Sequence, residues 1–178
     1  SEVERLKEEL DKLHKENREV LEDSKRSLDK ILDDVRKLAE DVKKRLDDIL
    51  KELRDRGVPE EALKEAEKVI TDLKRRIDEL LDRVRKIVEE LKRRHDRLLE
   101  EHKRIIDDIK DKLEKNKTDR DLLRRLLREA ERVSEETKKE SKKLNDEIRK
   151  VLERLRDELR KIEDEIRKVV RRIRERAN

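Results

Sequence analysis

Histidine is the side chain with the widest chemical range in this sequence, and only three histidines occur among its 178 residues. Two of them, His95 and His102, stand in the stretch RRHDRLLEEHKRI, where the surrounding helix pattern calls for Leu or Ile. Such histidines can bind a metal, act as general bases, respond to pH or form buried hydrogen bonds that specify packing. The residues around them decide between these roles.

A metal site or an active site needs partners that the sequence does not place near the histidines. His95 and His102 are two helical turns apart, about 10 Å along the axis, so they cannot share one metal ion. His14 can face His102 from another segment, but no carboxylate or cysteine of the apolar pattern completes a set of ligands. There is no HExxH motif and no nucleophile in an activating setting. We therefore expect no metal, no cofactor and no enzymatic activity.

The composition restricts the class of protein. Charged residues make up 60% of the chain and hydrophobic residues 31%, and it contains no aromatic residue, Cys or Met. The 55 basic and 51 acidic residues nearly balance, at a net charge of +4, which argues against disorder caused by charge repulsion. A composition rich in Glu, Lys, Leu and Arg with helical periodicity is typical of long helices.

Compartment and partners are only weakly constrained. The absence of Cys leaves the redox compartment undetermined, and the localisation with it. No apolar run approaches the ~20 residues that cross a bilayer, so we expect a soluble protein. Basic runs such as RRIRER are interrupted by Glu or aliphatic residues, and no aromatic side chain offers a stacking platform for bases. We expect these runs to be solvated helix faces, with no nucleic-acid or membrane partner.

Two short segments divide the chain into three helices. In RGVPEE, Gly57 can close one helix and Pro59 suits the first turn of the next. In KNKTDRD, Asn116 can close a helix, and Thr118 or Asp119 can cap the one that follows. These signals predict helices over about 2–56, 59–115 and 119–176.

One apolar seam runs along each predicted helix. Its members recur at steps of three and four with a mean of about 3.6 residues, which keeps helices nearly straight, whereas a strict heptad forces a supercoil. Because each helix is apolar along one stripe and the connections are short, consecutive helices should pack antiparallel. We expect an all-α, single-chain, antiparallel up-down-up three-helix bundle over 1–178, present as a monomer. The seam predicted for the first helix runs through Val3, Leu6, Leu10, Leu13, Asn17, Val20, Ser24, Leu28, Ile31, Val35, Leu38, Val42, Leu46, Ile49 and Leu53.

Antiparallel packing places the polar interruptions of the three seams at matching heights. His102 should lie level with residues near 14 and 133, and His95 with residues near 21 and 140. A polar group buried alone costs about 1–3 kcal/mol, whereas donors and acceptors gathered at one height satisfy one another. We therefore predict a buried hydrogen-bond network that penalises slipped helix registers. Its predicted members are His95, His102, Asn17, Ser24, Thr137 and Ser141, with His14, Ser27, Ser134 and Asn145 at its margin.

The whole chain resembles parametrically built, de novo designed helical bundles, in particular those with a buried hydrogen-bond network. The resemblance lies in the near-uniform seam spacing, the core of Leu, Ile and Val, the surface of Glu, Asp, Lys and Arg, and the short capped loops. Evolved three-helix proteins such as spectrin-like repeats fill irregular gaps with aromatic residues and Met, which are absent here. The resemblance implies a stable structural scaffold without natural activity or partner.

Two alternative functions remain open at this stage. The chain could be an interaction module whose helices open to accept a partner helix or hairpin. It could also be a pH-responsive bundle, because burial depresses the pKa of a histidine and makes the folded state lose stability in acid.

Overall fold

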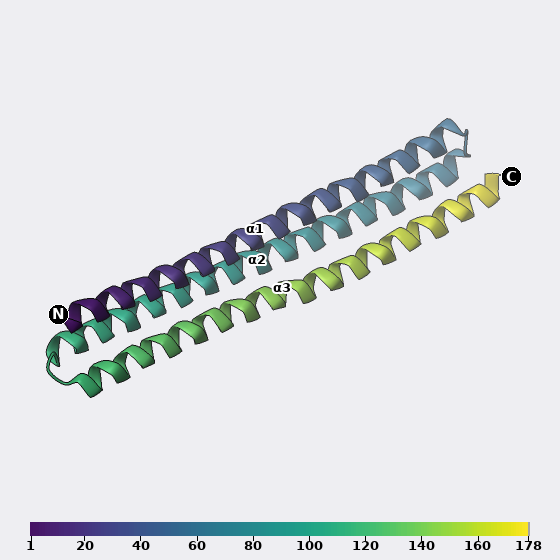
Figure 1. The fold of residues 1–178 in the computed structure, drawn as a ribbon. Helices are drawn as coiled ribbons and strands as arrows, with labels where there is room; N and C mark the ends of the chain where they lie inside the picture. The colour runs from purple at the N-terminus through teal and green to yellow at the C-terminus, as the bar shows by residue number, and fades with distance from the viewer. Residues whose placement is uncertain (178) are drawn as a thin grey trace. The chain divides into compact units, whose positions relative to one another are not determined.

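Three long helices make up almost the entire chain. The computed structural model describes residues 1–177, with side chains as far as Glu175, and Asn178, the last residue of the predicted bundle, lies outside the described residues. The helices are α1 (Glu2–Asp55), α2 (Glu60–Lys115) and α3 (Arg120–Ala177), joined by two short loops (Figure 1). The predicted bounds are confirmed to within about one residue.

The loop between α1 and α2 closes α1 through its glycine. Gly57 adopts a φ of 68°, a conformation that costs a residue with a Cβ more than it costs glycine. This turn lets the amide of Val58 donate to the carbonyl of Leu53 at 3.3 Å, and the amide of Gly57 donate to Arg54 at 3.1 Å. The two bonds satisfy carbonyls that the last turn of α1 would otherwise leave unpaired.

The loop between α2 and α3 shows which of two predicted caps is used. The side-chain amide of Asn116 donates to the carbonyl of Lys112 at 2.8 Å, at the end of α2. The amide of Leu122 donates to the Asp119 carboxylate at 3.1 Å, so Asp119 and not Thr118 caps α3.

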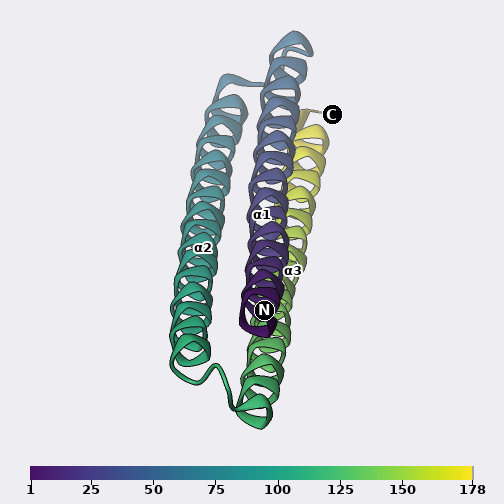
Figure 2. The same ribbon diagram turned by 60° about the vertical axis from the view of Figure 1, so that its left-hand side comes forward.

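The chain forms two compact units, and each contains a segment of all three helices. Unit 1 comprises Ser1–Asp29 and Val88–Ile148, and unit 2 comprises Lys30–Ile87 and the chain from Arg149 onward. In each unit α2 runs antiparallel to α1 and α3, as the colour gradient along the helices shows (Figures 1 and 2). Ion pairs between α1 and α2 agree with this direction, at 2.6 Å for Lys25–Asp96 in unit 1 and 2.8 Å for Arg54–Glu67 in unit 2. The three-helix bundle predicted from the seams is thus confirmed.

Aliphatic side chains from all three helices fill the core of each unit. Their burial removes apolar surface from water, which is the main source of stability. One cluster in unit 1 comprises Val3, Leu6 and Leu10 of α1, Ile106, Ile109 and Leu113 of α2, and Leu123, Leu126 and Ala130 of α3. A cluster in unit 2 comprises Leu53, Ala62, Ala66 and Ile173. Within the described residues, no helix carries an apolar stretch long enough to cross a bilayer.

The seam prediction for the first helix was wrong at two positions. Val20 and Leu38 are both 37% exposed, while their neighbours Leu21 and Ala39 are buried. Adjacent residues point about 100° apart on a helix, so the core side of an apolar pair depends on where the two neighbouring helices lie. Periodicity along one helix does not contain that information.

Candidate functional site: a buried histidine and serine network

Two groups of side chains join all three helices inside unit 1. The His95 layer consists of Ser24 from α1, His95 from α2 and Ser141 from α3. The His102 layer consists of His14 from α1, His102 from α2 and Ser134 from α3. Each layer therefore takes one residue from each helix.

Three hydrogen bonds in series make up the His95 layer. The imidazole of His95 is 0% exposed. Its Nδ1 lies 2.7 Å from the carbonyl oxygen of Leu91, and its Nε2 lies 3.0 Å from the Ser141 hydroxyl. The Ser141 hydroxyl lies 3.0 Å from that of Ser24. Ser24 is half-buried, so this series of hydrogen bonds runs from the edge of the bundle to its centre.

The carbonyl of Leu91 fixes the direction of every hydrogen bond in this layer. A carbonyl only accepts, so His95 Nδ1 carries a proton and donates it. In neutral imidazole the other nitrogen then accepts, and the Ser141 hydroxyl must donate to His95 Nε2. That uses the only hydrogen of Ser141, so Ser24 donates to Ser141. Ser141 is consequently the sole donor to a fully buried nitrogen.

The His102 layer pairs two imidazoles across α1 and α2. His102 is 1% exposed, and its Nε2 lies 2.9 Å from the hydroxyl of buried Ser134. Its Nδ1 lies 3.4 Å from Nδ1 of half-buried His14. The two rings are within 10° of parallel with centroids 5.6 Å apart. Because the nitrogens are much closer than the centroids, the rings meet through their Nδ1 edges rather than face to face.

Burial keeps the three histidines neutral near pH 7. Desolvation is the main cause that lowers the pKa of His95, and the hydrogen bond to Leu91 opposes it. Desolvation, followed by the nearby His14 and Lys138, lowers the pKa of His102 from 6.5 to about 4. The pKa of His14 is also lowered, by its partial burial and then by Arg18.

Thr137 and Asn17, two other predicted members of the network, form hydrogen bonds within their own helices. Thr137 is buried but donates to the carbonyl of Val133 in its own helix at 2.9 Å. Asn17 is fully buried, and its side-chain amide donates to the carbonyl of Leu13 at 3.1 Å. Such bonds to the preceding turn compete with bonds to other helices.

Two further predicted members, Asn145 and Ser27, are less buried than His95 and His102. Asn145 is half-buried, and its Oδ1 is buried without a hydrogen-bond partner. Ser27 is exposed, because Leu28 occupies the core position of that turn and Ser27 points about 100° away from it.

Replacing Asn17 with Leu should stabilise the protein. Asn17 Oδ1 is buried and has no hydrogen-bond partner, and an unsatisfied buried polar atom costs about 1–3 kcal/mol. Asn17→Leu removes that atom and adds apolar burial, so we expect the free energy of unfolding to rise by about 1 kcal/mol. Guanidinium denaturation measures it, with the exposed Glu16→Leu as the control for added hydrophobicity. A loss of stability in Asn17→Leu would show that Oδ1 makes a favourable contact.

An ion pair missed by the sequence reasoning flanks the His95 layer. Lys25 follows Ser24 on α1, and Asp96 follows His95 on α2, and their charged atoms lie 2.6 Å apart. The hydrogen bond to Asp96 is the main cause that raises the pKa of Lys25. The sequence contained a signal for this ion pair, because Lys25 and Asp96 carry opposite charges and follow two residues that were predicted to face each other.

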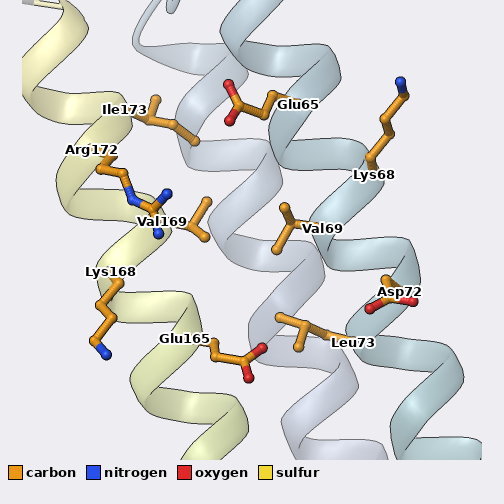
Figure 3. Close-up of a pocket in the computed structure, with 10 residues that line it drawn as sticks. All are labelled: Glu65, Lys68, Val69, Asp72, Leu73, Glu165, Lys168, Val169, Arg172 and Ile173. Carbon is orange, nitrogen blue, oxygen red and sulfur yellow. The ribbon is translucent and has the colours of Figure 1, made fainter.

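Grooves large enough for a ligand lie away from the histidines. Figure 3 shows one between α2 and α3 in unit 2, with a volume of about 440 Å³. Val69, Leu73, Val169 and Ile173 form its apolar part, and three acidic and three basic residues surround them. The charges balance and the groove contains no histidine, so it offers no constellation for catalysis.

The fold and the network together define a class, an all-α three-helix bundle with buried histidine–serine hydrogen bonds that connect its helices. Comparison with protein-family models, curated proteins and solved structures finds no match to this chain. Among residues 1–177, no group of three or more His, Asp or Glu side chains is placed to hold a metal ion.

Proposed function

We propose that the chain is a designed structural scaffold whose buried network specifies how its three helices pack, and that it is a monomer without natural enzymatic activity, cofactor or partner. The observation that carries this proposal is the composition of the two layers, each of which takes one residue from each helix. The lack of any matching natural family is compatible with a designed origin.

The spacing of the two layers supports a role in setting the helix register. His95 and His102 lie two helical turns apart on α2. Their partners, Ser141 and Ser134, lie two turns apart on α3. Sliding α3 by two turns could bring Ser134 to His95, but His102 would then face Leu127. Sliding it the other way could bring Ser141 to His102, and His95 would face Ile148. Either slip leaves one buried imidazole nitrogen unpaired, at a cost of about 1–3 kcal/mol.

A network-free variant tests this proposal. In it, His95, His102 and His14 become Leu and Ser24, Ser134 and Ser141 become Ala. Aliphatic replacement of a satisfied polar network is often neutral or stabilising, so the thermal midpoint should stay equal or rise. The penalty against other registers is lost, so we expect additional amide peaks in ¹H–¹⁵N NMR spectra and oligomers in light scattering after size exclusion.

The control for this experiment carries six conservative substitutions at exposed positions and should keep one set of peaks and the mass of a monomer. A network-free variant that also keeps both would contradict the proposal, because the aliphatic seams alone would then specify the packing.

A pH-responsive bundle is the second candidate function. The specific observation in its favour is the lowered pKa of all three histidines, which sit in the layers that connect the helices. Protonation would place positive charge between helices at two heights. This pH-responsive function depends on the same network as the scaffold function. It differs in one requirement, that the loss of stability in acid be large enough to open the bundle.

A further inference from the structure

We propose that His14 and His102 form a binding site for Zn²⁺, with Nδ1 of each ring as a ligand and water molecules as the remaining ligands. This goes beyond the role of the network in packing, and it departs from the expectation of no metal site drawn from the sequence. The juxtaposition of the two Nδ1 atoms across α1 and α2 carries it.

The separation of the two nitrogens fits a tetrahedral ion. Zn–N bonds of 2.0–2.1 Å place two ligands of a tetrahedron about 3.3–3.4 Å apart. The two Nδ1 atoms are 3.4 Å apart. Adjacent positions of a square plane with similar bonds lie only about 2.8–3.0 Å apart, so the spacing favours Zn²⁺ over Cu²⁺ or Ni²⁺. As a hydrogen bond, by contrast, 3.4 Å is longer than the usual range of about 2.7–3.2 Å.

Ser134 is placed to accept the hydrogen bond that a metal-binding His102 would donate. A histidine that binds a metal through one ring nitrogen usually donates a hydrogen bond through the other, which fixes the ring orientation. His102 Nε2 lies 2.9 Å from the Ser134 hydroxyl, so a metal-binding His102 would donate there. The buried His102–Ser134 pair thus presents Nδ1 toward α1, where His14 meets it.

The partial exposure of His14 leaves room for the other ligands. His102 and Ser134 are buried, but His14 is half-buried, so the site lies at the edge of the bundle, where water reaches it. Structural zinc sites use four protein ligands and catalytic sites use three with a bound water, so a site with two histidines would be more open than either and would take its other ligands from water. The absence of a group of three His, Asp or Glu ligands in residues 1–177 is consistent with this limited set.

Surrounding charges give the site an unusual salt dependence. Arg18, Lys103 and Lys110 act electrostatically on His14, and Asp107 opposes them. Lys110 is paired with Asp11, so Arg18 and Lys103 supply most of the positive charge. This positive field repels a divalent cation, and salt screens the repulsion. Zn²⁺ affinity at the histidine pair should therefore increase with ionic strength, whereas affinity for the acidic surface should decrease.

Calorimetric titration of the full chain with Zn²⁺ tests the site. We expect His14→Ala to weaken binding at least tenfold, and Ser134→Ala to weaken it about tenfold through the loss of its hydrogen bond to His102. His14 is half-buried and Ala is a good helix former, so the first variant should fold. Lys15→Ala, a change on the exposed side of the same turn, is the matched control and should bind Zn²⁺ at least as tightly as the parent.

Imidazole ¹H–¹⁵N spectra identify the ligands directly. Zn²⁺ should shift the ring resonances of His14 and His102 and leave those of His95 in place, because both ring nitrogens of His95 are already engaged. Equal affinity in His14→Ala and Lys15→Ala, or binding that leaves the His14 and His102 resonances unmoved, would overturn the proposal. So would an affinity that falls as salt is added.

Discussion

Lowering the pH from 7.5 to 5 should reduce the free energy of unfolding of the metal-free protein by at least about 2 kcal/mol. The main source is His102, which is buried and whose pKa is lowered to about 4 by desolvation, by His14 of α1 and by Lys138 of α3. The lowered pKa values of His95 and His14 act in the same direction.

The sign follows from the number of protons that each state binds. In the unfolded chain His102 takes up a proton near pH 6.5, whereas in the folded chain it does so only near pH 4. Between these values the unfolded state binds more protons, so stability falls as the pH falls. The contribution of His102 is fully present above pH 6.5 and fully lost below pH 4.

Guanidinium denaturation at pH 7.5, 6.5, 5.5 and 5.0, with a chelator present, measures this loss. The window ends at pH 5 because the Asp82 and Glu114 carboxyls, whose pKa values are lowered by Arg85 and Lys7 respectively, remain ionised there. The control is a variant with Leu at 95 and 102 and Ala at 134 and 141, which should lose much less stability over the same window. Equal losses in both proteins would rule out His95 and His102 as the source.

The level of the network along the bundle could be predicted from the sequence because it depends only on geometry along the helices. Loop positions and a rise of about 1.5 Å per residue suffice to place His102 opposite His14 and His95 opposite Ser141. The structure brings both pairs within contact distance. The helix bounds were predictable for a similar reason, since Gly57 and Asp119 act through bonds within a few residues.

The hydrogen-bond partners could not be predicted, because they depend on a local competition that seam positions do not reveal. Thr137 was placed at the centre of the network and Ser134 at its margin, yet Thr137 bonds to its own helix while Ser134 meets His102. A side-chain donor one turn after a carbonyl can bond either to that carbonyl or to a polar group on a neighbouring helix. Which bond forms depends on how closely the neighbouring helix approaches. Asn17 shows the same outcome, since it bonds to Leu13.

Removing the Ser141 hydroxyl should destabilise the protein far more than removing that of Ser24. Ser141 is the only donor to His95 Nε2, which is buried, so Ser141→Ala leaves that nitrogen unpaired at a cost of about 2 kcal/mol. Ser24 only donates to Ser141, and Ser24→Ala leaves the Ser141 hydroxyl still bonded to His95, so it should cost about 0.5 kcal/mol. Guanidinium denaturation at pH 7.5 compares the two.

A double-mutant cycle with His95→Leu shows whether this cost belongs to the imidazole. In that background no nitrogen requires a donor, so Ser141→Ala should be nearly neutral, and the coupling between positions 95 and 141 should be about 2 kcal/mol. Imidazole ¹⁵N shifts should show the proton of neutral His95 on Nδ1, as the Leu91 carbonyl at 2.7 Å requires. Equal costs for the two serine variants, or a proton on Nε2, would mean that His95 donates to Ser141 and Ser141 donates to Ser24. The bond between His95 Nδ1 and the Leu91 carbonyl would then be lost, because neither atom could donate, and the other two bonds of the layer would run in the opposite direction.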